Sequence, residues 1–86
     1  PTPIPVKPPR LKPFDAARAC LAKGDNACVI AALEGKARSA HEMELLIETY
    51  RTMGNTEKAT ATMRTYVSRF PDEKRAMTYR RILDAH

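Results

Sequence analysis

The two cysteines are the residues of this sequence whose spacing most clearly suggests chemistry. Cys20 and Cys28 stand at equal distances on either side of Gly24 in the stretch CLAKGDNAC, and the chain has no other cysteine. Two thiols this close along a chain can form a disulfide, supply half of a metal site, or act as a redox pair. The elements that carry the cysteines decide between these possibilities.

Metal and redox chemistry fit the spacing poorly. Zinc sites use four ligands, usually with cysteines paired at shorter spacing, and the remaining candidates, His41 and His86, lie far along the chain. The C-x7-C spacing also differs from the C-x-x-C motif of thiol oxidoreductases. We therefore expect no metal and no cofactor. Two alternatives stay open, a disulfide between Cys20 and Cys28, which we prefer, and two small buried thiols.

No group of side chains suggests catalysis. The sequence shows no arrangement of Ser, His and Asp that would activate a nucleophile, and His41 is expected to be exposed in the first turn of a helix. The glutamates Glu42, Glu44 and Glu48 fit helix capping and a solvent-facing helix side. Short helices are also poorly placed to enclose a substrate pocket. The sequence therefore predicts a protein that is not an enzyme.

Composition favours helices over sheet. The chain of 86 residues has no tryptophan and few aromatic residues, while Ala, Arg, Leu and Met are common. This length allows one domain with a small core. No apolar run reaches the about 18 residues that a membrane span needs. Pro1 is not a start residue, which indicates an excised or processed piece.

Residues 1–13, PTPIPVKPPRLKP, are predicted to form a proline-rich linker ahead of a helical domain at 14–86. They hold six of the seven prolines, three basic residues and no acidic one. Because proline fixes φ and lacks an N–H donor, we expect an extended spacer here. A ligand for a proline-recognising groove is an alternative, since Pro5 and Pro8 match the P-x-x-P spacing.

Cap signals divide residues 14–86 into about five helices. We expect the following helices: Phe14 to Lys23, NACVIAALE, about Ala40 to Met53, Asn55 or Thr56 to Pro71, and a last one capped by Asp72. Glycine follows each of the first three, and Ser39 with Glu42 forms a capping box. The prediction is an all-α fold of two antiparallel helical hairpins and a C-terminal capping helix.

Apolar residues at helical spacing define the expected core. The third and fourth helices carry these stripes: Met43, Leu46, Ile47, Tyr50 and Met53, and Ala59, Met63, Tyr66, Val67 and Phe70. The two stripes should pack against each other as an antiparallel hairpin. We therefore expect Tyr50 and Tyr66 to be buried.

An internal repeat relates the two hairpins. Gly24 and Gly54 are thirty residues apart, and each separates a helix from a cap residue and a second helix. In this register three further pairs coincide: Cys20 with Tyr50, Val29 with Ala59, and Leu33 with Met63. The first unit is about four residues shorter in its second helix. We therefore expect a shortened hairpin followed by a complete one.

The second unit, from Ala40 to about Glu73, resembles a tetratricopeptide repeat (TPR). Leu46, Tyr50, Gly54, Ala59 and Pro71 match preferred residues of that family, while Met43, Ile47, Met63 and Tyr66 depart from its pattern. The resemblance implies a short TPR-like array that binds a protein or peptide on its concave side. Residues off the core stripes are the candidate partner contacts: Arg18, Glu44, Glu48 and Arg51.

The whole pattern is also similar to small helical modules at the C-terminal ends of some bacterial Ser/Thr protein kinases and related envelope proteins. The stretches that carry this likeness are the proline-rich spacer, CLAKGDNAC, LLIETYR and YVSRFP, and the catalytic motifs of a kinase are missing. The resemblance implies a tethered, non-catalytic scaffold or sensor module in signalling. A Cys20–Cys28 disulfide would indicate the periplasm or cell envelope, and free thiols the cytoplasm.

Two other functions remain as alternatives. A net charge of +5 permits an anionic partner such as nucleic acid, bound through a basic surface made of Arg64, Arg69, Arg75, Arg80 and Arg81. We disfavour nucleic acid because the chain lacks an aromatic stacking platform. The third function is structural, with an exposed apolar groove filled by a second copy in a homodimer.

Overall fold

The computed structural model describes residues 12–85, which form five α-helices and no strand. The helices are α1 (Pro13–Ala22), α2 (Asn26–Leu33), α3 (Ala40–Thr52), α4 (Thr56–Arg69) and α5 (Lys74–Asp84). The predicted all-α fold of about five helices is thus confirmed. Of the predicted linker, residues 1–11 lie outside the described part, and Pro13 is the first residue of α1, where its fixed φ suits the helix.

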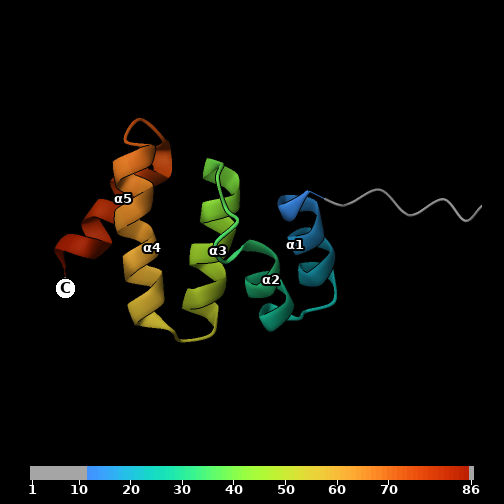
Figure 1. Ribbon diagram of the computed structural model, residues 1–86. Coiled ribbons are helices and arrows are strands. Elements are labelled where there is room, and N and C mark those ends of the chain that lie inside the picture. Colours follow the sequence, from blue (N-terminus) through green and yellow to red (C-terminus); the bar gives the residue numbers. More distant parts are fainter. Residues whose placement is uncertain (1–11, 86) are drawn as a thin grey trace, which may run out of the picture.

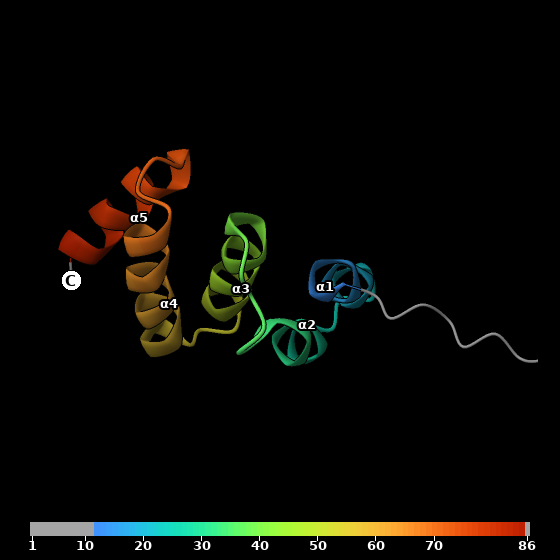
Figure 2. The ribbon, with the colours of Figure 1, turned by 45° about the horizontal axis from the view of Figure 1, so that its top comes forward.

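The helices follow one another in a row, with α1 at one end and α5 at the other (Figure 1). α1 packs against α2 to form the first hairpin, and α3 packs against α4 to form the second. The hairpins meet mainly where α2 contacts α3, and α5 covers the far side of α4. Figure 2 shows the same succession from a second angle.

The same turn joins the helices of both hairpins. Gly24 and Gly54 have φ values of +70° and +75°, in the left-handed region that glycine tolerates best. Asp25 and Asn55 follow them and cap the next helix, each accepting a hydrogen bond from a backbone N–H three residues ahead. Two backbone bonds also correspond: Asp25 N to Cys20 O at 3.1 Å, and Asn55 N to Tyr50 O at 2.9 Å.

The remaining helix starts differ in how they are capped. Ser39 and Glu42 form the predicted capping box, in which each side chain accepts a backbone N–H of the other residue. The prediction that Asp72 caps the last helix is wrong. Glu73 is the N-cap residue of α5, and its side chain forms no cap bond. The backbone N–H of Glu73 donates to Phe70 O at 3.2 Å, so residues 71–73 form a turn and the helix begins after it.

The first hairpin is shortened more than the sequence indicates. α2 has 8 residues and α4 has 14, a difference of six where we expected about four. The helix ends at Leu33 because Glu34 adopts an extended conformation with ψ of 122°. A connector of irregular backbone then leads to Ser39 and the start of α3.

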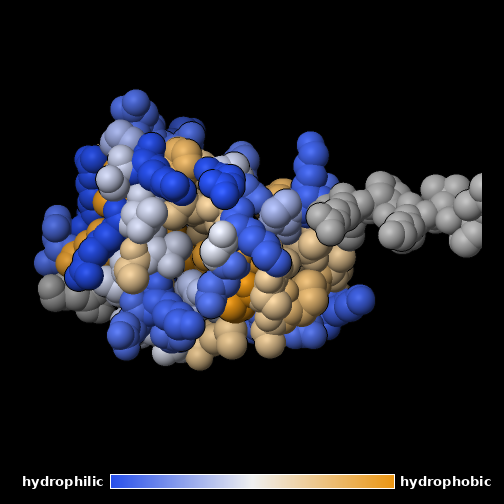
Figure 3. All heavy atoms as spheres, in the orientation of Figure 1, coloured by the Kyte–Doolittle hydropathy of each residue, from blue (hydrophilic) through white to orange (hydrophobic). Residues whose placement is uncertain are grey.

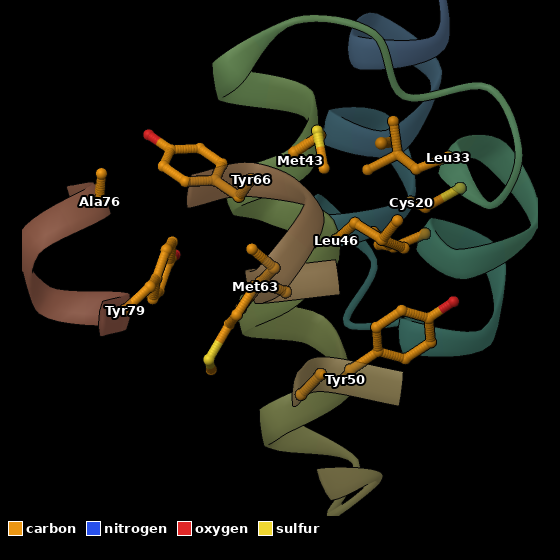
Figure 4. Packing of buried hydrophobic residues seen from close by; sticks show 13 residues of the cluster. Cys20, Leu33, Met43, Leu46, Tyr50, Met63, Tyr66, Ala76 and Tyr79 are labelled. Carbon is orange, nitrogen blue, oxygen red and sulfur yellow. The ribbon is translucent and has the colours of Figure 1, made fainter. Parts of the chain in front are cut away.

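One continuous core runs through the described residues. Its buried apolar members are Ala17, Cys20, Val29, Leu33, Met43, Leu46, Ile47, Tyr50, Ala59, Met63, Tyr66, Ala76 and Tyr79. Figure 4 shows Cys20, Leu33 and Leu46 on the side of the first hairpin, and Tyr66 and Tyr79 on the side of α5. The predicted burial of Tyr50 and Tyr66 is confirmed, and all three pairs of the thirty-residue register are buried.

Met53 is an exception to the predicted stripe. Its side chain is 50% exposed, because it is the C-cap residue of α3 and lies in the turn that joins α3 to α4. The surface in Figure 3 is hydrophilic over much of α4 and α5, whereas apolar residues gather over α1 and α2. Self-association through this apolar surface stays a prediction. Within residues 12–85, no helix has both the length and the apolar character needed to cross a membrane.

Candidate functional site

The structure pairs Cys20 with Cys28 at disulfide-bonding distance, with their Cα atoms 5.5 Å apart. Cys20 lies in the last turn of α1 and Cys28 near the start of α2, so the turn at Gly24 brings them to matching heights. A bond that closes this short loop stabilises the hairpin by roughly 2.5 kcal/mol in the chain-entropy model. The pairing fits the preferred alternative and is compatible with an extracytoplasmic protein.

Each of the three tyrosines in the chain donates its hydroxyl to a glutamate on another element. The pairs are Tyr50 with Glu34, Tyr66 with Glu44 at 2.6 Å, and Tyr79 with Glu48 at 3.0 Å. The rings are buried while the carboxylates lie at the edge of the core. The Tyr50 and Tyr66 pairs therefore join elements that pack against each other, and the Tyr79 pair links α5 to α3.

Burial and the paired carboxylates raise the pKa of all three tyrosines, with burial the larger cause. The pKa of Tyr79 rises to about 12, and the pKa values of Tyr50 and Tyr66 rise as well. A tyrosine that acts as a nucleophile or base needs a lowered pKa, because its anion is the reactive form. The pairs are accordingly suited to holding helices together.

Two of the predicted partner contacts are engaged within the chain. Arg75 of α5 reaches both, with its Nε 3.4 Å from Glu44 Oε1 and its Nη1 4.0 Å from Glu48 Oε2. The side chain of Glu44 is only 17% exposed. We expected both glutamates on an open side of the third helix, but the side chains of Arg75 and Tyr79 on α5 reach that side and bind them.

The other two predicted contacts are more accessible. Arg18 on α1 is exposed, with its guanidinium 5.9 Å from the centroid of the Phe14 ring. Arg51 on α3 is 47% exposed, and its Nη1 lies 3.4 Å from Glu48 Oε1. Surface ion pairs of this kind contribute little stability and exchange readily with a partner's charges. These two arginines can therefore contact a ligand without disturbing the core.

The predicted basic surface divides into two parts. Arg75 is committed to Glu44 and Glu48. The other four arginines are exposed and form no ion pair within residues 12–85: Arg64 and Arg69 on α4, and Arg80 and Arg81 on α5.

A groove beside the start of α1 is not predicted by the sequence pattern. It has a volume of about 480 Å³ and lies between the first residues of α1, the connector after α2 and the first turn of α3. Basic residues line it from both segments, including Lys12, Lys36 and Arg38. The sequence alone does not indicate that these basic residues cluster, because Lys12 and the connector are brought together only by the packing of the helices.

The polar contacts and the repeated turn are the features from which a role can be argued. Within the described part of the chain, no three His, Cys, Asp or Glu side chains are grouped as ligands for a metal ion. Comparison with models of protein families, with curated proteins and with solved structures gives no significant match for this chain.

Proposed function

We propose that this chain is a non-catalytic protein-interaction domain, made of one TPR-like hairpin preceded by a shortened copy and followed by a capping helix. The observation that supports it is the repeated turn, in which Gly24 and Gly54 have the same backbone conformation, the same cap and the same hydrogen bonds. Hairpins of one design stacked side by side present their first helices as a continuous surface. A partner peptide or helix then lies across α1, α3 and α5.

The accessible charges of these helices define how the partner is held. Arg18 and Arg51 are exposed, while the core residues beneath them are fixed by packing. Such contacts lie at the rim of an interface and each contributes modestly. Three short helices therefore predict an affinity in the micromolar class, which a tether or a larger assembly increases.

Selection of peptides from a random library against the 86-residue chain, followed by NMR mapping, tests this proposal. Shift changes should concentrate on α1, α3 and α5. Combining Arg18→Ala with Arg51→Ala should weaken binding about tenfold, since two rim contacts together supply about 1.4 kcal/mol. Arg64→Ala, which removes an exposed arginine of α4 outside the proposed surface, is the matched control. Shift changes confined to α2 and α4 would contradict the proposed surface.

The location is part of the same proposal. Pairing of Cys20 with Cys28 supports the periplasm or cell envelope, because disulfides persist in oxidising compartments. We place the domain there as a scaffold or sensor module, tethered by its proline-rich segment. The intact mass of the protein from its own cell, compared with and without alkylation under denaturing, non-reducing conditions, should show no free thiol. Two alkylated cysteines would contradict this location.

A second candidate function is favoured by the four arginines of α4 and α5 that have no ion pair within residues 12–85. Exposed guanidinium groups bind phosphate, so duplex and single-stranded DNA are the appropriate probes. A mobility-shift assay at low and at moderate salt measures the binding of each kind of DNA. Binding that falls steeply with salt would support this function, and no binding at low micromolar protein would eliminate it.

A further inference from the structure

The groove beside the start of α1 combines an apolar floor with a basic rim. Pro13 and Phe14 are half-buried and supply the floor. Lys12, Lys36 and Arg38 are exposed at its edge, and none of them forms an ion pair within the described chain. With about 480 Å³ the groove has room for a large side chain and the residues around it.

The one carboxylate that lines this groove is already bonded. Glu42 Oε1 accepts the backbone N–H of Ser39 at 3.0 Å and that of Arg38 at 3.2 Å. Burial opposes ionisation of Glu42, but these hydrogen bonds and the charge of Arg38 lower its pKa overall. Glu42 therefore stays an anion that serves the helix cap and offsets part of the charge of Arg38, but the three basic side chains of the rim outnumber it.

In the second hairpin, an aromatic side chain fills the place that corresponds to this groove. In the thirty-residue register Phe14 corresponds to Glu44, and Lys36 corresponds to Tyr66. Tyr66 is fully buried, and its hydroxyl lies 2.6 Å from Glu44 Oε2. Lys36 is exposed instead, because α2 ends at Leu33 and the chain leaves the helix before reaching this position. The first hairpin thus lacks the aromatic side chain that closes the second.

We infer that this groove binds an acidic peptide segment that carries one aromatic side chain, an inference that rests on the proposed role in protein interaction. The aromatic ring packs on Phe14, in the place that Tyr66 occupies in the second hairpin. Carboxylates on either side of the ring face Lys36 and Arg38. Charge complementarity selects this occupant over the chain's own proline-rich segment, which contains basic and no acidic residues.

A fluorescein-labelled peptide, Glu-Asp-Glu-Gly-Tyr-Gly-Glu-Asp-Glu, tests the inference by fluorescence anisotropy with the full chain. Lys36→Glu or Arg38→Glu should weaken binding about tenfold, because each places a like charge against the peptide. Arg80→Glu is the matched control, an exposed charge reversal on α5 that should change affinity less than about twofold. A peptide with Ala in place of Tyr should also bind about tenfold more weakly, because the buried ring is lost.

The outcomes distinguish binding in this groove from binding elsewhere on the molecule. Equal weakening by Arg80→Glu, or no effect of Lys36→Glu, would overturn the inference. Tighter binding of single-stranded DNA, with the same sensitivity to Lys36→Glu, would overturn it in favour of nucleic acid. Peptide binding that survives Lys36→Glu but is weakened by combining Arg18→Ala with Arg51→Ala would overturn the groove and leave the proposed function intact. If the selected peptides caused no shift changes on α1, α3 and α5 while the acidic peptide still bound in the groove, the proposed surface would be overturned and the groove would stand.

Discussion

The two hairpins share one turn but hold their helices together by different means. Buried residues of the first are small or aliphatic, and Cys20 and Cys28 join its helices at disulfide-bonding distance. The second buries Tyr50 and Tyr66, whose hydroxyls donate to glutamates on adjacent elements. A hairpin whose buried side chains are small gains much from a covalent link, while one that buries large aromatic rings has more apolar surface to hold it together.

The difference in length between α2 and α4 explains why the two hairpins differ at their surfaces. α4 is long enough to carry Tyr66 into the contact with α5, where the two rings of Tyr66 and Tyr79 lie 5.1 Å apart edge to face. α2 is too short to supply an equivalent ring, so the connector passes over that place with Lys36 exposed. The shorter α2 thus leaves a groove at the first hairpin, which is why we expect this hairpin to bind the acidic peptide.

The largest expected effect is the loss of the Tyr66 ring. Tyr66→Ala should lower the free energy of unfolding by about 3–5 kcal/mol, because it leaves a cavity in the contact between α4 and α5. Chemical denaturation measures this. Tyr66→Phe is the control and should cost about 1 kcal/mol, since it removes only the hydrogen bond to Glu44. Equal costs for the two variants would show that ring packing does not dominate here.

Removing the disulfide should have a smaller and more local effect. Combining Cys20→Ala with Cys28→Ala should lower the free energy of unfolding by roughly 2.5 kcal/mol, the chain-entropy value for this short loop. Hydrogen exchange should accelerate in α1 and α2 while α3 and α4 keep their protection. Ala31→Ser, on the exposed side of α2, is the control. Uniform acceleration across all five helices would contradict a difference between the hairpins.

The shared turn predicts equal effects in both hairpins. Gly24→Ala and Gly54→Ala should each cost about 1–2 kcal/mol, because each forces an L-residue into the left-handed conformation. A Cβ added at either glycine meets nothing within 4 Å, so no packing clash enters the comparison. Thermal or urea denaturation of both variants measures the two costs. A difference above about 0.5 kcal/mol would show that the turns are not equivalent.

The sequence predicted those features that depend on local spacing. Helix periodicity and cap residues identified the five helices, the capping box of Ser39 and Glu42, and the burial of Tyr50 and Tyr66. These follow from contacts within one helix or between helices joined by a short turn. The start of α5 was predicted one residue too early. Asp is a favoured N-cap residue, and only the turn after Phe70 shows that Asp72 is not the cap.

Contacts between distant helices could not be predicted in this way. Periodicity shows which side of a helix is polar, but it does not show which helix lies opposite. Glu44 and Glu48 were therefore assigned to a partner, whereas Arg75 and the tyrosine hydroxyls bind them within the chain. The groove was missed for the same reason, since its two basic segments are joined only by the packing of α1 and α2 against α3.

The smallest expected effect concerns the polar contact between the two hairpins. Glu34, just after α2, accepts the hydroxyl of Tyr50 and lies 3.5 Å from Lys58 Nζ. The hydrogen bond from Tyr50, and then the charge of Lys58, lower the pKa of Glu34 below its ordinary 4.5. Because the pKa is lower in the folded state, this contact stabilises the fold above the unfolded pKa and is lost as the pH falls through the folded value.

Tyr50→Phe should therefore return the pKa of Glu34 most of the way toward 4.5, as measured by NMR titration of its side-chain carboxyl carbon. Tyr79→Phe removes a hydroxyl that binds a different glutamate, so it should leave the Glu34 value unchanged. If Tyr50→Phe also left it unchanged, the hydrogen bond would not persist in solution. The shortened hairpin would then be held to the second mainly by its apolar contact with α3, and its separate unfolding should become easier to detect.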